Sequence, residues 1–362
     1  MAQHDYVIDN STGANVRADI NNALLAISSN NSGSSAPSTN YASQFFANTS
    51  SSMMQLNNTS GNAFINLFTL AGAPAFPLDG TINSINIGKG ANSVAGNTVL
   101  GEGALDASVT GGNNTAIGNN ALTALTSGAS NVAVGSAALD ANTTGGFNIG
   151  VGHTTLGANS TGSQNTGVGH GVLQENTTAS NNTGVGQNAL QKNTTGASNT
   201  AVGGNALDAN TTASNNTAIG QQALTANTTG ASNTALGQLA LGNNTTASNN
   251  TGIGYNALLA NTTGANNSAL GSTALDALTT GNNNVAIGQS ALGAATNSSN
   301  NVAVGQGALN DNTTGSNNTA VGRIALSENT TANNNTAMGN EALKANTTGT
   351  QQVAVGGQAL AS

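Results

Sequence analysis

The chain has 362 residues, of which 5% are charged and 2% aromatic, and it contains 48 glycines and no cysteine. Its formal net charge of -8 at pH 7 is spread thinly and includes no basic cluster, so neither a nucleic-acid groove nor binding to an anionic membrane surface is expected. Without cysteine there is no disulfide framework. The sequence contains no run of about 18 apolar residues, so no membrane-spanning segment is predicted.

Residues 1–38 are predicted to contain one short amphipathic helix. Their opening, MAQHDYVIDN, lacks the charged and apolar stretches of a signal peptide. Within NVRADINNALLAIS, apolar residues recur at helical spacing, and Asn15 is suited to cap the N-terminus. So short a helix is not expected to be stable alone in water. Its apolar face includes Val16, Ile20, Leu24 and Ile27.

Seven of the nine aromatic residues precede residue 80, so the first eighty residues form a different module from the rest of the chain. The runs YASQFFANT, SSMMQLNN and NAFINLFTLAG are separated by Asn and Ser, and they predict a small antiparallel sheet over residues 39–71. The segment GAPAFPLDG, residues 72–80, holds two of the three prolines and is predicted to be a linker.

This first part of the chain resembles the N-terminal modules of tail-fibre proteins from short-tailed bacteriophages of the marine kind. The matching elements are MAQHDYVIDNSTGANVRADINNALLAI, NSGSSAPST and LFTLAG. In that family the N-terminus docks on the virion and the distal part meets the host. The resemblance implies that residues 1–38 attach to a tail adaptor or nozzle protein, with the predicted helix as the docking element. It also implies a location in the virion tail.

Residues 81–362 repeat with a period of 17. A glycine, the marker glycine, recurs at this interval from Gly101 to Gly356, and a leucine follows four positions later in all sixteen units. Such strict register indicates that each unit contacts mainly the next, as in a solenoid. Seventeen residues cannot hold two helices, so each unit is predicted to be one coil of a parallel β-solenoid with two short strands. At about 4.8 Å per coil the rod would be about 75 Å long.

The two faces of the first strand carry different side chains. In NTAIG, residues 216–220, Thr217 and Ile219 point one way and Ala218 the other. The aliphatic side is predicted to be buried, and the side with Ala and Gly is predicted to need a partner, which favours a homo-oligomer with this side inward. The predicted core of the repeat includes Leu207, Ile219, Leu224 and Leu241.

The second strand, TANTTG, is polar and is expected to face water. Asparagines stacked in register can form ladders of side-chain hydrogen bonds, and Asn216 is expected at a corner with left-handed backbone angles. The phrases NTAVG..AL and NVAIG..AL resemble the head repeats of trimeric autotransporter adhesins, although the period is longer here. That resemblance implies a left-handed parallel β-roll wound as a homotrimer. The residues of this sequence predict no export signal, heptad stalk or anchoring barrel of that family, so only the fold is expected to transfer.

Candidate catalytic and metal-binding groups are sparse, and neither an enzyme activity nor a cofactor is predicted. The acids of the repeat occur one at a time, at Asp106, Asp140, Glu175, Asp208, Asp276, Asp311 and Glu328. His153 and His170 both follow a marker glycine and should stack on adjacent coils. They are the candidate ligands for a transition metal, with plain surface placement as the alternative.

The sequence therefore predicts a non-enzymatic, homotrimeric phage tail fibre. Its N-terminus would attach to the virion, and its β-roll would extend toward a host cell-surface receptor or a distal virion protein. Two alternatives remain open. One is a secreted or surface adhesin, and the other is an ice-binding β-solenoid, because flat threonine arrays such as the NTT row can match an ice lattice.

Overall fold

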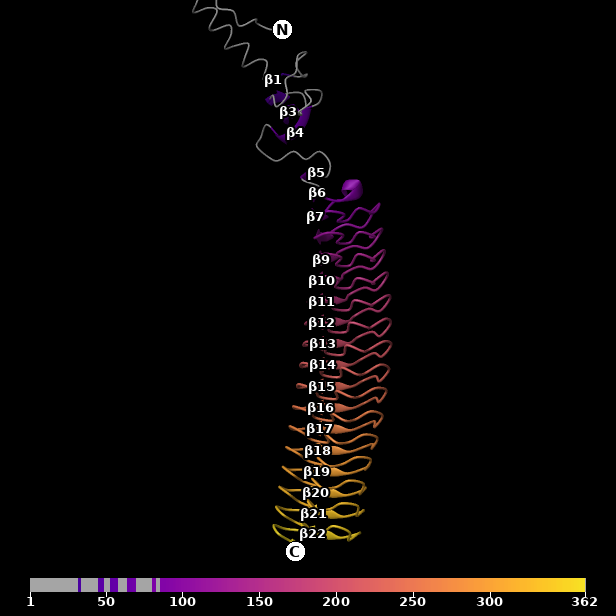
Figure 1. Ribbon diagram of the computed structural model, residues 1–362, viewed down its shortest axis with the longest axis vertical. Coiled ribbons are helices and arrows are strands. Elements are labelled where there is room, and N and C mark those ends of the chain that lie inside the picture. Colours follow the sequence, from indigo (N-terminus) through magenta and orange to yellow (C-terminus); the bar gives the residue numbers. More distant parts are fainter. Residues whose placement is uncertain are drawn as a thin grey trace, which may run out of the picture. The chain divides into compact units, whose positions relative to one another are not determined.

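The computed structural model describes residues 32–33, 45–48, 53–57, 64–69, 80–82 and 85–361 (Figure 1). The chain divides into two compact units, residues 1–80 and residues 81–362, and each is described by itself. The predicted helix with Val16, Ile20, Leu24 and Ile27 lies outside the described residues.

The first unit contains a four-stranded sheet in the order β1-β2-β3-β4. Strands β2, β3 and β4 pair antiparallel, as the runs between residues 39 and 71 predict, and β1 joins β2 in parallel. A register shift between Met54 and Gln55 marks a bulge in β3. The strands are β1 (Ser32–Gly33), β2 (Phe45–Asn48), β3 (Met53–Asn57) and β4 (Phe64–Thr69).

The second unit begins with an antiparallel pair and continues as a parallel solenoid (Figure 1). β5 (Gly80–Ile82) and β6 (Ile85–Gly88) precede a short 3-10 turn, η1 (Ala91–Ser93), and β7 (Thr98–Gly101). Because β6 runs antiparallel to β7, it covers the strand edge of the first coil.

Strands β7 to β22 form one parallel ladder in which each strand pairs with the next, 17 residues later. Each strand from β8 onward is only three residues long. These strands are β8 (Thr115–Ile117), β9 (Val132–Val134), β10 (Ile149–Val151), β11 (Thr166–Val168), β12 (Thr183–Val185), β13 (Thr200–Val202), β14 (Thr217–Ile219), β15 (Thr234–Leu236), β16 (Thr251–Ile253), β17 (Ser268–Leu270), β18 (Val285–Ile287), β19 (Val302–Val304), β20 (Thr319–Val321), β21 (Thr336–Met338) and β22 (Val353–Val355).

The marker glycine directly follows each strand from β8 to β21, at a place where no side chain fits. Gly220 has φ 133°, and a Cβ on it would lie 2.5 Å from the carbonyl oxygen of Gly237 in the next coil. A side chain would therefore clash with the backbone of its neighbour as well as strain its own.

Each coil has one strand, so the prediction of a second strand at TANTTG is wrong for the coils described. The chain turns sharply there instead, because the asparagine of this segment points inward. Asn227 is fully buried, and its Nδ2 donates hydrogen bonds to Oδ1 of Asn210 at 3.1 Å and to the carbonyl oxygen of Gly230 at 2.9 Å.

The same carbonyl oxygen of Gly230 also accepts a 3.0 Å hydrogen bond from Nδ2 of Asn216. Asn216 also belongs to a second ladder, in which its backbone N–H donates a 2.9 Å hydrogen bond to Oδ1 of Asn199 in the preceding coil. The predicted asparagine ladders are thus present, but both are buried. The left-handed residue at this corner is Asn215, with φ 63°, and not Asn216.

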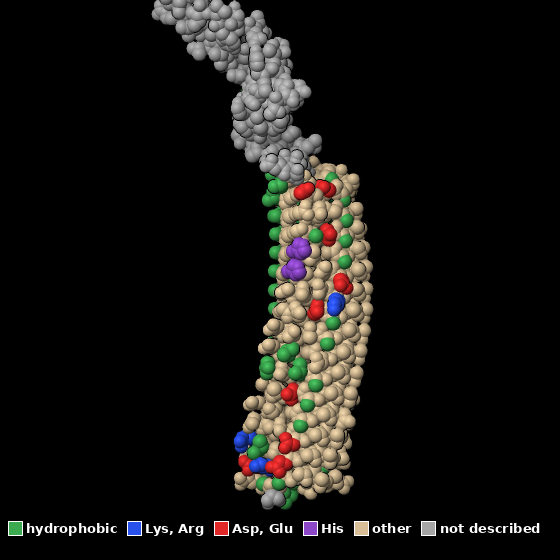
Figure 2. Space-filling view, viewed as in Figure 1, with side chains coloured by type: hydrophobic (Ala, Val, Ile, Leu, Met, Phe, Trp, Pro, Cys, Tyr) green, Lys and Arg blue, Asp and Glu red, His purple; other side chains and the backbone are tan. Residues whose placement is uncertain are grey.

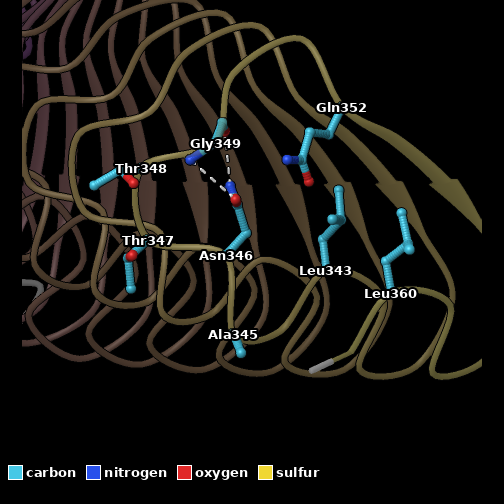
Figure 3. A pocket seen from close by; sticks show the side chains of 8 residues that line it. All are labelled: Leu343, Ala345, Asn346, Thr347, Thr348, Gly349, Gln352 and Leu360. Atoms are coloured by element: carbon cyan, nitrogen blue, oxygen red, sulfur yellow. Dashed lines mark hydrogen bonds between the residues drawn. The ribbon is translucent and has the colours of Figure 1, made fainter.

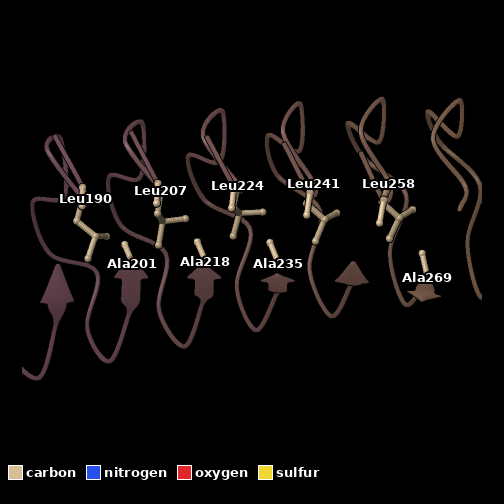
Figure 4. Close-up of a cluster of buried hydrophobic side chains, with 14 of the residues drawn as sticks. Leu190, Ala201, Leu207, Ala218, Leu224, Ala235, Leu241, Leu258 and Ala269 are labelled. Atoms are coloured by element: carbon tan, nitrogen blue, oxygen red, sulfur yellow. The ribbon is translucent and has the colours of Figure 1, made fainter. Parts of the chain in front are cut away.

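The hydrophobic core lies inside the coil, between the strand and the turn that follows it (Figure 4). Leu207, Leu224 and Leu241 are fully buried, where the sequence places them, and Ala218 at the centre of β14 faces them. Ile219 is 37% exposed, so the assignment of Ile219 to the core is wrong. The two strand faces are reversed because the narrow coil is filled by its leucine and leaves room only for Ala or Gly at the strand centre from β8 onward; the centre of β7 is Val99, which is also buried.

Candidate functional site

The candidate site is the outer sheet face, which we define as the outward side chains of β7 to β22. The two ends of each three-residue strand point outward, and its centre points inward. Parallel pairing is in register, with Thr200 opposite Thr217 and Val202 opposite Ile219. Equivalent residues therefore form two continuous rows along the rod, about 4.8 Å apart from coil to coil.

The second of these rows, the aliphatic row, holds a large apolar side chain in every coil. No residue in it is charged or polar. Its members are Leu100, Ile117, Val134, Val151, Val168, Val185, Val202, Ile219, Leu236, Ile253, Leu270, Ile287, Val304, Val321, Met338 and Val355.

The aliphatic row is open to solvent in the single chain. Val202 is 36% exposed and Leu270 47%, and the remaining members are half-buried or exposed. Hydrophobic side chains recur from coil to coil along this unit, with few charged groups among them (Figure 2). A continuous apolar row of this length is unusual for a surface that faces only water.

The companion row holds Thr217 and its equivalents, with Ser268 once and Val or Ile in the remaining coils. Its members lie two residues before those of the aliphatic row, so both rows share one face. The row at Thr228, predicted to be the outer polar face, is only half exposed. The Oγ1 of Thr228 donates a 3.0 Å hydrogen bond to the carbonyl oxygen of Thr245 in the next coil.

His153 and His170 are stacked, as predicted, with ring centroids 5.4 Å apart and ring planes 5° from parallel. Both side chains are exposed. Within the described part of the chain, no group of three or more His, Cys, Asp or Glu side chains could hold a metal ion.

Three carboxylates of the repeat are affected by burial, and they do not lie near one another. Burial raises the pKa of Asp140, Asp208 and Asp276 above the ordinary value of 3.8. These three residues lie four coils apart, about 19 Å, whereas paired glycosidase carboxylates lie within about 10 Å. Asp106 is two coils from Asp140 and accepts a 2.8 Å hydrogen bond from Asn86.

A depression of about 370 Å³ lies at the last coil (Figure 3). It is lined by residues such as Leu343 and Asn346, whose equivalents in earlier coils are covered by the following coil. Asn346 makes the same hydrogen bond as its equivalents, from Nδ2 to the carbonyl oxygen of Gly349 at 2.9 Å. The depression is therefore the uncovered cross-section of a coil. Its lining is Leu343, Ala345, Asn346, Thr347, Thr348, Gly349, Gln352 and Leu360.

Among the described residues, no helix has the length and apolar character that a membrane crossing requires. Comparison of the chain with protein-family models, with curated proteins and with solved structures finds no match. The geometry of the solenoid and its outer sheet face is thus the basis for a functional proposal.

Proposed function

We propose that this protein is a structural fibre of a bacteriophage tail. Three copies associate through the aliphatic row, the N-terminal residues attach the fibre to the virion, and the solenoid extends toward the host surface. The observation that carries this proposal is the aliphatic row, which is uncharged and in register from β7 to β22.

The size of this row supports self-association. If each aliphatic side chain leaves about 60 Å² exposed, the sixteen together offer about 1,000 Å² per chain, compared with about 800 Å² per partner in an interface of standard size. The row alone is therefore large enough for an interface of standard size.

The arrangement of the copies follows from attachment at one end. If all N-termini join the same virion protein, the chains run in the same direction and are related by rotation about the long axis of the rod. Identical rows then meet at the same height, because every chain has the same 17-residue register. The resemblance to trimeric autotransporter heads favours three copies. Ala218 is buried within its own coil, so it does not form this interface.

Lysine substitution along the row tests the proposal. The triple variant Val202→Lys, Ile219→Lys and Leu236→Lys should lose the trimer, because the interface would bury unpaired charges. Light scattering should give three times the chain mass for the parent protein and a lower mass for the variant. The matched control places lysines on an exposed row of the same coils, at Thr212, Thr229 and Thr246, and should keep the trimer.

Equal trimer mass for both lysine variants would contradict the proposed interface. The attachment role is tested separately by deleting residues 1–38. The shortened protein should keep its trimer mass and fail to enter particles. Its incorporation at the normal level would place virion attachment elsewhere.

An ice-binding solenoid remains a second candidate, because threonines and aliphatic residues share the outer sheet face in register. This function requires that the face stay open in solution. Thermal hysteresis from a monomeric protein, lost on substitution of Thr217 and its neighbours, would favour ice binding over the fibre.

A further inference from the structure

The two stacked histidines form an isolated feature of the outer surface. They occupy the position after the marker glycine on consecutive coils, and the same position is glutamine in several other coils, including Gln187 and Gln221. The backbone at this position is fixed by the ladder. The carbonyl oxygen of His153 accepts a 3.1 Å hydrogen bond from the N–H of Gly171, and that of His170 accepts a 2.9 Å bond from Asn188.

This geometry brings two imidazoles close enough to share one metal ion. A bound transition metal lies 2.0–2.1 Å from an imidazole nitrogen, so two nitrogens on one metal are at most about 4.2 Å apart. The ring centroids of His153 and His170 are 5.4 Å apart. The rings are stacked face to face, and the lone pair of an imidazole nitrogen lies in the ring plane, so the rings must tilt to share an ion. Because both side chains are exposed, rotations about their χ angles can point one nitrogen of each ring at a common metal ion while the backbones stay in place.

We propose that His153 and His170 form a two-histidine binding site for a divalent transition metal, with water in the remaining positions. Imidazole nitrogens bind Cu²⁺ most tightly among the divalent first-row metals, so Cu²⁺ is the ion with which the site is best detected. The bound ion links two successive coils. The chain has a net charge of -8, which favours a cation over an anion at this surface. This site is independent of the proposed fibre function.

The experiment uses the full chain with His4→Gln, because His4 is the third of the three histidines and would bind copper on its own. In this background, titration calorimetry with Cu²⁺ should give one ion per chain, and electron paramagnetic resonance should show two imidazole nitrogens on the copper. His153→Gln and His170→Gln should each weaken binding at least about tenfold, since the second imidazole no longer binds within the same molecule. Glutamine occupies this position natively in other coils, so the coil should tolerate both changes.

Moving one histidine to another coil distinguishes chelation by two imidazoles from copper binding by single histidines. In the His153→Gln background, Gln187→His places an imidazole on the coil after His170 and should restore the parent affinity. Gln221→His adds the same side chain three coils from His170, about 14 Å away, and should not restore it. The proposal is overturned if His153→Gln keeps the parent affinity. It is also overturned if the two displaced histidines restore binding equally or if neither does.

Discussion

The leucine of each coil is buried at the expense of a strained backbone. Leu224 has φ 55°, in the left-handed region, which costs about 1–2 kcal/mol for a residue other than glycine. Full burial of a leucine side chain stabilises by about 1.5–3 kcal/mol, so burial outweighs the strain. The repeated leucine is thus selected by packing, against its backbone preference.

Neighbouring core positions compensate for each other in size. Most coils have alanine both at the strand centre and just before the leucine, as at Ala218 and Ala223. Val172 replaces the second of these alanines, and the adjacent strand centre is then Gly184. A Cβ on Gly184 would overlap Cγ1 of Val172.

We therefore expect Gly184→Ala to destabilise the protein by about 1–3 kcal/mol through overpacking. Adding Val172→Ala should remove most of this cost, because the pair then matches the alanine pairs of the other coils. Chemical unfolding of the two single variants and the double variant measures the coupling. If the cost of Gly184→Ala is unchanged by Val172→Ala, the packing described between them is incorrect.

Asp208 illustrates how burial tunes a surface carboxylate. Desolvation is the largest cause of its raised pKa; Lys192 lowers the pKa and Glu175 raises it. The folded protein therefore binds this proton more readily than the unfolded chain, so the group destabilises the fold at neutral pH and ceases to do so in acid.

Asp208→Asn should accordingly raise the melting temperature at about pH 7, and the difference should vanish near about pH 3, below the ordinary aspartate pKa. Asparagine is native at the same row position in Asn310, so the coil accepts the amide. A melting temperature lowered by the substitution at pH 7 would show that the contact with Lys192 outweighs desolvation.

The asparagine ladder explains how successive coils hold their register. In the ladder through Asn227, each Nδ2 donates to Oδ1 of the preceding coil. The ladder is interrupted where Leu278 replaces the next asparagine, and Oδ1 of Asn261 is consequently buried without a hydrogen-bond partner.

This interruption provides a matched comparison between two asparagines. Asn227→Ala removes bonds on both sides and should cost about 1–3 kcal/mol, the usual penalty for buried groups left unpaired. Asn261→Ala should cost less, because it also removes an oxygen that has no partner. Unfolding free energies of the two variants decide the point, and an equal or larger cost for Asn261→Ala would contradict the ladder.

The sequence was sufficient to predict the period, the parallel stacking, the antiparallel strands β2 to β4 and the stacked histidines. It did not predict correctly which face of each strand is buried, because the alternation of side chains separates two faces without showing which one lies inside. Ile219 is larger and more apolar than Ala218, so it was expected in the core. Ala218 lies in the core instead because Leu224 already fills most of the interior of the coil. The occurrence of Gly184 next to the larger Val172 was the sequence signal that space at the strand centre is limited.

The outer sheet face is the surface through which the second unit can associate with other molecules. Its core is complete within one chain, with leucine, alanine and asparagine rows buried from coil to coil. The aliphatic row adds nothing to that core and remains exposed along the rod. The central claim of the proposed function is that this row is where copies of the chain meet.

Disulfide cross-linking tests this claim directly, because the chain has no cysteine of its own. Ile219→Cys places a thiol in the aliphatic row, and Thr229→Cys places one on an exposed row of the same coil. Under mild oxidation at low protein concentration, Ile219→Cys should give covalent dimers on a non-reducing gel, since two of the three thiols at the axis can pair, and Thr229→Cys should remain single-chain. Efficient cross-linking of Thr229→Cys with none for Ile219→Cys would contradict the proposed interface.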